Sequence, residues 1–350
     1  MKFSPLDASH RSLNAKMVPF GGWDMPLAYS TGTLTEHAAC RTSATMFDVS
    51  HLGTVRVEGA DALDRLQEVL TNDLSKIAPG RAQYTHLLDE NNASVLDDII
   101  VWWVSEDVFD VMPNASNTDR VVAAIGGTDT TATRAVIAVQ GPDARRLVAT
   151  FCSEAAEVPR FYVREVVVCG HQCVVAGTGY TGEDGIEIAV PVEGAADVWN
   201  ALLVAGVIPA GLGARDTLRL ESALPLHGHE LGEGITPLQA GLEWVVAWKK
   251  PSFQGREALS VEKESGVARR LVGIAIEGRR PARDGSRVLD TDGLEIGFVS
   301  SGNFSPTLGH CIALAFVTPS TVVDQQVLLD VRGTHIPGVV VTTPFVAKKK

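Results

Sequence analysis

Two stretches of this 350-residue sequence place acidic residues where a strand would hold them in an apolar sheet. The first is "VLDDIIVWW" at 95–103, in which apolar residues flank the pair Asp97 and Asp98. Side chains alternate along a strand, so Asp98 shares a face with Ile100 while Asp97 points to the other face. The two carboxylates therefore do not form a shared acid–base pair of the glycosidase type. One of them lies in an apolar wall, where it needs a hydrogen-bond donor or a raised pKa, unless both acids only cap a turn.

The second stretch, "GTGYTGEDGIEI" at 177–188, combines glycines with three acidic residues. Glycine-rich loops often bind phosphate, but no Lys follows these glycines and the acids would repel an anion. Glu187 alternates with Ile186 and Ile188, so a strand would present its carboxylate just behind the glycine turn. A carboxylate in this position can accept two parallel N–H bonds from a planar heterocycle such as a pterin or a guanine. The alternative is a surface hairpin with solvated acids.

A helix is expected over "GLGARDTLRLESAL" at 211–224, with Arg215 and Arg219 one turn apart on the same face. These arginines either hold a ligand carboxylate or pair with neighbouring acids, and the second outcome is the commoner one. The "HGHE" stretch at 227–230 lacks a spaced Cys or Asp partner, and the five cysteines form no CxxC. The sequence therefore predicts no metal site.

The elements that position these residues follow from an internal repeat. "TVRVEGADALDRL" at 54–66 and "AVIAVQGPDARRL" at 135–147 share the pattern VxGxDA at an offset of 82 residues. A second pair, "DVFDVMPNASNTDRVVAAI" and "GIEIAVPVEGAADVWNALL", runs in each copy from an apolar strand through a turn into a helix. Each copy is therefore expected to form strand, helix, several strands and helix, an α+β sandwich of the split-βαβ kind, unless the likeness is chance.

The two ends of the chain have sequence patterns that differ from those of the repeats. The first fifty residues show little strand alternation and contain an expected helix near 35–45, which should pack onto the second repeat. Beyond residue 270, short apolar runs are separated by Gly, Pro and Asp turns, a pattern typical of a small β-barrel or sandwich.

Composition narrows the possible partners and location. The formal net charge of −12 argues against nucleic acid and anionic membrane surfaces. No segment approaches about 18 uninterrupted apolar residues, and the start carries no apolar signal core, so a cytoplasmic protein is expected. The only basic run, Lys348–Lys350, is interpreted as a solvated end.

Taken in order, ten stretches of the chain resemble the aminomethyltransferase (T-protein) family of the glycine cleavage system. The resemblance implies an α+β fold of three domains in a cloverleaf: two related α/β sandwich units and a small C-terminal β-barrel, with folate in a central channel. The expected domains are 1–52 plus 135–240, 53–134 plus 241–268, and 269–350. The stretches are "MVPFGGWDMPLAY", "HAACRTSATMFDVSHLG", "LTNDLSKIAPGRAQYT", "DDIIV", "AVQGPDA", "GYTGEDGIEI", "GLGARDTLRLESALPLHGHEL", "TPLQAGLEWVV", "FQGREAL" and "SSGNFSPTLGHCIALAFV".

The resemblance also implies a reaction and roles for individual residues. The family takes an aminomethyl group from the lipoyl arm of H-protein, releases ammonia and passes the carbon to tetrahydrofolate, giving methylenetetrahydrofolate without a metal. Asp98 matches the family's essential carboxylate, and Glu187 matches a pterin contact. Other matches to the folate pocket are Tyr180, Arg215, Tyr84 and Asn114.

Two other functions are known on this fold, and the first of them is the serious alternative. Tetrahydrofolate-dependent O- or S-demethylases share the folate site, whereas the intact "DDIIV" and "GYTGEDG" stretches favour the T-protein. A non-catalytic iron–sulfur assembly factor carries a KGCYxGQE motif where this chain has "PSFQGREAL", without Cys. The chain also ends "PFVAKKK" and lacks the terminal tyrosines that are common in the T-protein family.

Overall fold

The computed structural model describes residues 1–347, so the basic run Lys348–Lys350 lies outside the described residues. The chain divides into two compact units. The first comprises Met1–Leu87 and Asp97–Arg215, and the second comprises Leu88–Leu96 and Asp216 onward. Strands β6 (Arg81–Leu88) and β7 (Val95–Ser105) and helix α8 (Leu212–Glu221) carry the chain from one unit to the other.

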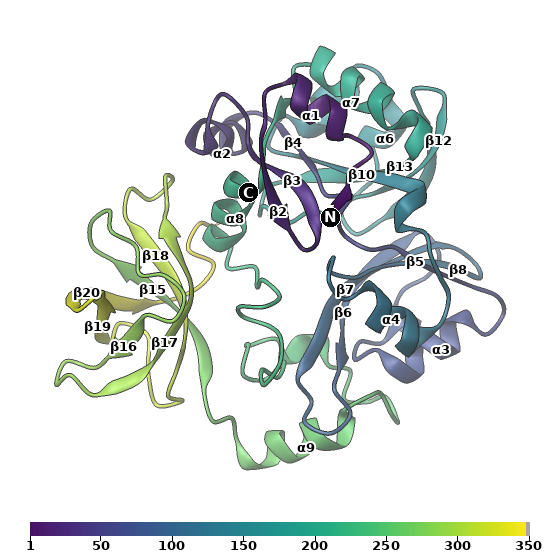
Figure 1. Ribbon diagram of the computed structural model, residues 1–350. Coiled ribbons are helices and arrows are strands. Elements are labelled where there is room, and N and C mark those ends of the chain that lie inside the picture. Colours follow the sequence, from purple (N-terminus) through teal and green to yellow (C-terminus); the bar gives the residue numbers. More distant parts are fainter. Residues whose placement is uncertain (348–350) are drawn as a thin grey trace. The chain divides into compact units, whose positions relative to one another are not determined.

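A six-stranded sheet in the order β11-β12-β13-β10-β4-β14 forms the larger layer of the first unit. One face of β10 and β13 presents Ile137 and Ile188 to an apolar core that includes Trp199 of helix α7. Helices α6 and α7 lie on this side of the sheet (Figure 1). The elements are β4 (Thr45–Asp48), β10 (Arg134–Gln140), α5 (Ala144–Val148), α6 (Ser153–Ala156), β11 (Val163–Val168), β12 (His171–Ala176), β13 (Gly185–Pro191), α7 (Ala195–Val204) and β14 (Ile208–Pro209).

A five-stranded sheet in the order β6-β7-β8-β5-β9 forms the second layer, with helices α3 and α4 beside it (Figure 1). Its central order β6-β7-β8-β5 repeats the order β11-β12-β13-β10 of the larger sheet. Along the chain, a helix follows the first strand of each copy, β5 or β10, and another follows the last strand, β8 or β13. The repeat predicted from the sequence is therefore present in the topology. The further elements are β5 (Val55–Glu58), α3 (Ala62–Val69), β8 (Val108–Met112), α4 (Thr118–Ile125) and β9 (Thr128–Asp129).

The N-terminal segment contains more strand than the sequence predicted. Strands β1 (Lys2–Phe3), β2 (Lys16–Phe20) and β3 (Trp23–Ala28) form a small sheet, and helix α2 (Thr33–Thr42) follows it. The expectation of little strand was wrong because prolines at 19 and 26, which normally argue against a strand, sit within these short strands.

A buried polar network holds the N-terminal segment on the larger sheet. His10, on helix α1 (Asp7–Ser12), lies 2.8 Å through Nε2 from Oδ2 of Asp48 on β4. Its Nδ1 lies 2.8 Å from the hydroxyl oxygen of Tyr29, and its ring packs edge-on against Trp199. The expected packing of this segment onto the second repeat is confirmed.

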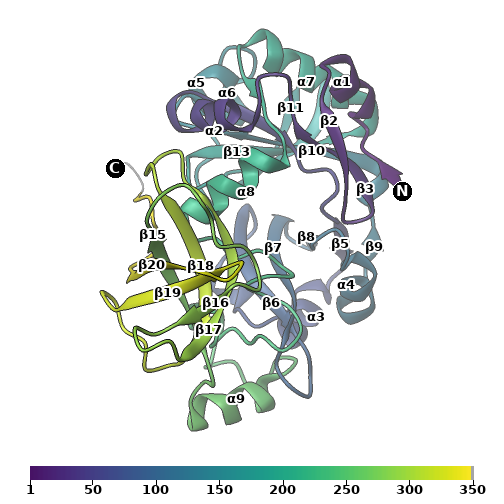
Figure 2. The same cartoon turned by 60° about the vertical axis from the view of Figure 1, so that its left-hand side comes forward.

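The second unit contains a closed barrel in the order β15-β18-β17-β16-β19-β20, visible in Figure 2. Its interior is filled by apolar side chains such as Ile274, Ala313 and Val340. A separate apolar cluster joins Leu88 and Val95 to Leu259 of helix α9 (Arg256–Ser265). The barrel strands are β15 (Arg270–Ile276), β16 (Arg287–Leu289), β17 (Glu295–Phe304), β18 (Cys311–Val317), β19 (Gln326–Val331) and β20 (Thr334–Val341).

The predicted α+β class, with two related sheet-and-helix units and a C-terminal barrel, is confirmed by these sheets. The finer domain boundaries given above stay a prediction. Within residues 1–347, none of the helices has the length and apolar character needed to cross a membrane. Short 3₁₀ turns occur at Leu74–Lys76, Thr131–Thr133, Val192–Gly194 and Glu243–Val245.

Candidate active site

The structure brings two other sequence-predicted residues, Tyr84 and Asn114, to Asp98 on strand β7. The Tyr84 hydroxyl, on β6, donates to Oδ2 of Asp98 at 3.0 Å. Nδ2 of Asn114, which follows β8, donates to Oδ1 of Asp98 at 2.7 Å. Both carboxylate oxygens are thus held by donors, one on the neighbouring strand β6 and one just after β8, which fixes the orientation of the carboxylate.

Asp97 is not independent of Asp98, although the two side chains leave the strand on opposite faces. Asp97 is completely buried and accepts hydrogen bonds from the backbone N–H of Asn114 at 3.1 Å, its Nδ2 at 2.8 Å and Nδ2 of Asn117 at 2.9 Å. The Asn114 amide therefore bridges both carboxylates. Burial raises the pKa of Asp97, and the neighbouring charge of Asp98 raises it further.

Tyr84 is held as a neutral donor by its surroundings. Burial and the charge of Asp98 raise the pKa of Tyr84 well above its ordinary value, and Tyr180 adds to this effect. His86, two residues along β6, places Nε2 3.2 Å from the Tyr84 hydroxyl, and burial lowers the pKa of His86 to about 3. At neutral pH this group therefore presents a phenol and an uncharged imidazole beside Asp98. The alternation of "QYTH" offered a signal for His86, which was missed.

A second group of predicted residues forms around Glu187 on β13. Glu187 is only 7% exposed and accepts a hydrogen bond from the Thr178 hydroxyl at 2.5 Å. Ile186 and Ile188 point into the core, so Glu187 faces the other side of the sheet, as predicted. The Arg215 guanidinium lies over the Tyr180 ring at 4.9 Å, and its Nη1 is buried without a hydrogen-bond partner among the described residues.

The electrostatics of this group depend on burial. Burial lowers the pKa of Arg215, while the charge of Glu187 opposes that effect, and a guanidinium stays charged at any working pH. His51 is also buried, and its Nδ1 lacks a partner within residues 1–347. Burial and the charge of Arg215 lower the pKa of His51 to about 4, so its ring is neutral. No sequence pattern indicated that His51 lies near Arg215.

Arg219 has a different role from Arg215. It belongs to the second unit and is 2% exposed, with Nη1 2.9 Å from Glu230 and Nε 2.9 Å from Asp216. Arg219 therefore pairs with neighbouring acids, which is the commoner of the two expected roles. Its partner Glu230 is the acidic residue of the "HGHE" stretch. Nowhere in residues 1–347 do three His, Cys, Asp or Glu side chains gather as a metal site would require.

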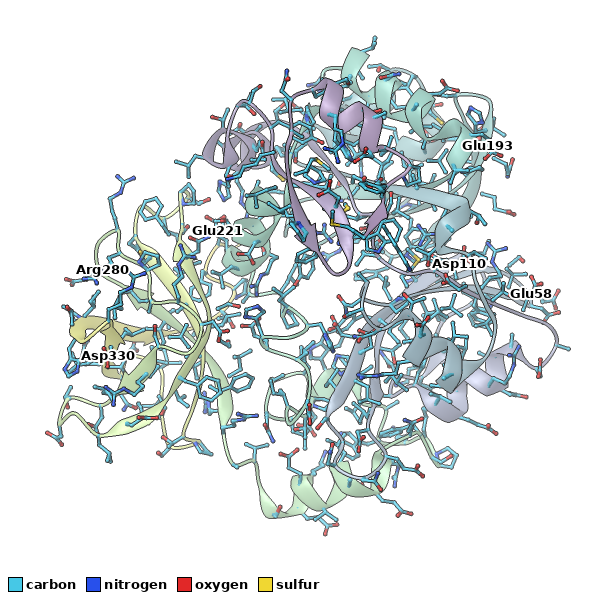
Figure 3. All side chains as sticks on the ribbon, in the orientation of Figure 1. Glu58, Asp110, Glu193, Glu221, Arg280 and Asp330 are labelled. Carbon is cyan, nitrogen blue, oxygen red and sulfur yellow. The ribbon has the colours of Figure 1, made fainter. Side chains whose placement is uncertain are left out.

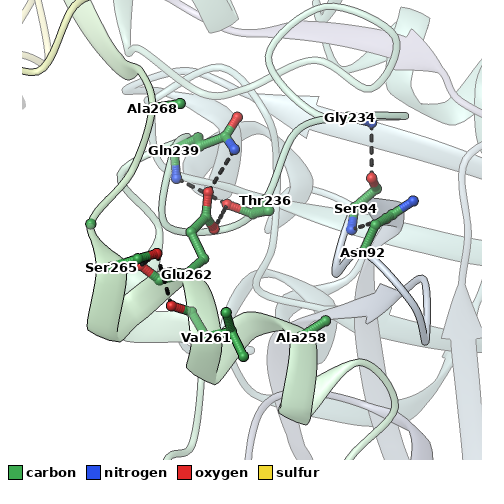
Figure 4. A pocket seen from close by; sticks show the side chains of 11 residues that line it. Asn92, Ser94, Gly234, Thr236, Gln239, Ala258, Val261, Glu262, Ser265 and Ala268 are labelled. Carbon is green, nitrogen blue, oxygen red and sulfur yellow. Dashed lines mark hydrogen bonds between the residues drawn. The ribbon is translucent and has the colours of Figure 1, made fainter.

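A cavity of about 470 Å³ in the second unit is a poor candidate for the reactive site (Figure 4). Its carboxylate, Glu262, accepts hydrogen bonds from Thr236 at 2.5 Å and from Gln239 at 2.7 Å. Gln239 in turn accepts a hydrogen bond from Arg269 at 2.9 Å. The polar groups at this cavity satisfy one another, in contrast to Arg215 and His51 in the first unit.

The arrangement in the first unit suits a ring that offers N–H donors and a reaction that develops positive charge. Asp98, on the five-stranded sheet, is half-buried, and Glu187, on the six-stranded sheet, is nearly buried. Both are acceptors held by hydrogen bonds in surroundings where an electrostatic interaction is stronger than in water. Arg215 supplies a donor that the described chain leaves without a partner. These are the groups needed to hold a polar heterocycle and to stabilise a cationic centre.

Comparison with known proteins identifies the family of the chain. A family model described as the GCVT N-terminal domain matches residues 6–250, and one described as the glycine cleavage T-protein C-terminal barrel domain matches residues 269–347. The aminomethyltransferase of Synechococcus elongatus is 42% identical, covering 98% of this chain and 95% of its own. That of Mycobacterium bovis is 45% identical, covering 99% and 97%.

A solved structure is similar over the whole fold. The crystal structure of the glycine cleavage system aminomethyltransferase T from Bartonella henselae matches with a TM-score of 0.93 and 34% sequence identity, covering 99% of both chains. Both family models, the full-length relatives and this structure agree with one another. The chain therefore belongs to the glycine cleavage T-protein family and is an aminomethyltransferase.

Proposed function

We propose that the chain acts in glycine catabolism by transferring the carbon of an aminomethyl group from the lipoyl arm of an H-protein to tetrahydrofolate. The bond from this carbon to nitrogen breaks and ammonia leaves, and the bond to the lipoyl sulfur breaks to give a free thiol. Two new bonds to the folate amines give 5,10-methylenetetrahydrofolate, and the two amine protons go to ammonia and to the thiol. We place the reaction in the cytoplasm.

Tetrahydrofolate, as the co-substrate, supplies the two amines that accept the carbon. The unfilled hydrogen-bonding capacity beside Glu187 fits its ring. Glu187 has one donor among the described residues, the Thr178 hydroxyl, and so retains acceptor capacity for the amine and ring N–H of a pterin. Nη1 of Arg215 is a buried donor without a partner in residues 1–347, suited to a ring carbonyl, and Tyr180 stacks beneath it. We assign these three residues to folate binding.

We assign the central catalytic role to Asp98. Loss of ammonia from an aminomethyl thioether leaves a cationic carbon–sulfur or carbon–nitrogen centre, which an oriented carboxylate stabilises. Tyr84 and Asn114 hold one oxygen each, so the carboxylate needs little reorganisation as charge develops. The same carboxylate is placed to accept a proton from a folate amine. The enzyme then works mainly by positioning two substrates, with a smaller contribution from proton transfer.

The observation that carries this proposal is the pairing of a doubly held carboxylate, Asp98, with an under-satisfied carboxylate and guanidinium, Glu187 and Arg215, in one unit. The serious alternative is a demethylase that uses the same folate groups with an O- or S-methyl donor.

The two functions separate in one assay. The purified chain is mixed anaerobically with aminomethylated H-protein and tetrahydrofolate, and ammonia and methylenetetrahydrofolate are measured together. We expect the two products in equal amounts. Folate binding without turnover, together with methyltetrahydrofolate formation from methyl donors, would replace the proposal with the demethylase.

A further inference from the structure

The two repeats place a carboxylate at the same position of their sheets. Arg56 on β5 lies directly opposite Asp110 on β8, and Ala138 on β10 lies directly opposite Glu187 on β13. Ala138 follows Arg56 by 82 residues, which is the offset between the copies of the VxGxDA pattern. Asp110 and Glu187 are therefore equivalent, each on the sheet face away from its helices.

In the first repeat this carboxylate is fully paired within the protein. Nε and Nη2 of Arg56 donate to the two oxygens of Asp110 at 2.5 and 2.9 Å, a bidentate ion pair. On the other neighbouring strand, the fully buried Trp102 lies opposite Asp110. Figure 3 labels Asp110, which is 3% exposed in the first unit. The Asp110 carboxylate is therefore occupied by an ion pair within the protein.

In the second repeat the same neighbours are alanines. Ala138 replaces Arg56 on one side of Glu187, and Ala176 replaces Trp102 on the other. Glu187 is still 7% exposed, yet its only hydrogen-bond donor among the described residues is the Thr178 hydroxyl. A nearly buried carboxylate with a single neutral donor is under-satisfied, because burial removes the water that would otherwise solvate it.

Nearby charged groups do not explain why Asp110 is paired by an arginine and Glu187 is not. Arg134, on β10, interacts electrostatically with both Asp110 and Glu187, which oppose the burial that lowers the pKa of Arg134 to about 10. Both carboxylates therefore lie near the same buried guanidinium, and Glu187 also lies near the charge of Arg215. The direct hydrogen bonds differ, because Arg56 donates twice to Asp110 whereas Ala138, opposite Glu187, donates none from its side chain.

We propose that Ala138 keeps Glu187 available to the folate ring, because it places no arginine directly opposite this carboxylate. This inference rests on the proposed function. A pterin ring presents an amine and a ring N–H side by side, and a guanidinium presents the same parallel pair of donors. The bound ring thus takes, in the second repeat, the role that Arg56 has in the first. An arginine at 138 would close the site by the contact that the first repeat already contains.

The space around the side chain at position 138 determines which control variant is needed. On β4, the other neighbour of β10, the residue opposite Ala138 is Phe47, which is 1% exposed. On β9, the other neighbour of β5, the residue opposite Arg56 is the exposed Thr128. A long side chain at 138 thus meets a more crowded neighbour than Arg56 does. Ala138→Met therefore serves as the volume control, because Met approximates the stem of Arg without its charge.

The experiment is anaerobic calorimetric titration of tetrahydrofolate into the full chain and three variants, with Tm recorded for each. We expect Ala138→Arg to bind at least about 30-fold more weakly than the parent and Ala138→Met less than about 5-fold more weakly. Arg56→Met should lower Tm and leave the Kd within about twofold, because its ion pair is structural. Equal affinities of Ala138→Arg and the parent, or of Ala138→Arg and Ala138→Met, would overturn the inference.

The remaining outcomes are also decisive. If Ala138→Arg does not fold, Ala138→Gln replaces it, because its amide can donate one hydrogen bond to Glu187. We then expect weaker binding than for Ala138→Met, and equal affinities overturn the inference. If the parent itself does not bind tetrahydrofolate, the proposed function fails first and the inference fails with it. Parent binding that no variant at 138 alters overturns only the inference.

Discussion

Replacing Asn114 with alanine tests whether one amide controls both carboxylates of the Asp97–Asp98 pair. The change removes donations from Nδ2 to Asp97 at 2.8 Å and to Asp98 at 2.7 Å, and leaves the backbone donation to Asp97 in place. A hydrogen bond to a charged group contributes about 1.5–3 kcal/mol. Because Asn114 is only partly buried, water replaces some of this, and we expect a loss of about 3 kcal/mol in the free energy of unfolding.

The loss should depend on pH in a definite direction. In the fold, burial and the charge of Asp98 raise the pKa of Asp97, so protonated Asp97 is favoured relative to the unfolded chain. Its stabilising contribution is present at low pH and is lost as pH rises through the folded pKa. Without the Asn114 amide the pKa of Asp97 rises further. Because the pKa of Asp97 in the fold is raised to about 8, the deficit should grow by up to about 0.8 kcal/mol as pH increases from 5.5 to 8.5.

The assay is urea unfolding of the parent and Asn114→Ala at both pH values, with Asn117→Ala as the matched control. Asn117 donates to Asp97 at 2.9 Å, so its loss should cost about 2 kcal/mol while Tyr84 and Asn114 still donate to Asp98. Asn114→Ala should in addition lower kcat/KM at least about tenfold more than the control. An Asn114→Ala deficit below about 1 kcal/mol that does not change with pH would refute this reasoning.

Three further predictions concern the donors of the site. Tyr84→Phe removes the hydroxyl that donates to Asp98 at 3.0 Å and should lower kcat about 10- to 100-fold with little change in Tm, measured by single turnover; an unchanged kcat contradicts it. Burial raises the pKa of Tyr84 well above its ordinary value, so Tyr84 should not lose its proton near pH 10. Plots of kcat/KM against pH should therefore have the same shape near pH 10 for the parent and for Tyr84→Phe, and a fall in the parent alone would contradict this. Arg215→Lys keeps the charge but loses the planar contact with Tyr180 at 4.9 Å, so folate Kd should rise about tenfold in calorimetry; equal affinities would argue against stacking.

Much of the architecture was predictable because it depends on local patterns. The echo around Val57 and Val139 predicted a repeat, and the structure contains the same strand order twice. The turn-rich strands after residue 270 predicted the barrel. The N-terminal sheet was missed because Pro19 and Pro26, which normally argue against a strand, lie within its strands, and pairing with neighbouring strands stabilises them.

The site was predictable in part. Alternation put Glu187 on the face away from Ile186 and Ile188, and the structure agrees. The bridge from Asn114 to both carboxylates and the position of His51 near Arg215 were not predictable. They arise from strands and loops brought together by the fold, over separations that no local pattern records.

The most direct test of the central claim is single turnover of aminomethylated H-protein with tetrahydrofolate by the parent and by Asp98→Asn. The substitution removes the charge and retains a side chain of the same shape beside Tyr84 and Asn114. We predict that ammonia release and methylenetetrahydrofolate formation fall by at least about 1000-fold while folate binding persists, because the lost carboxylate acts on charge that develops in the transition state. Turnover by Asp98→Asn within about tenfold of the parent would contradict the assignment of Asp98 as the catalytic carboxylate.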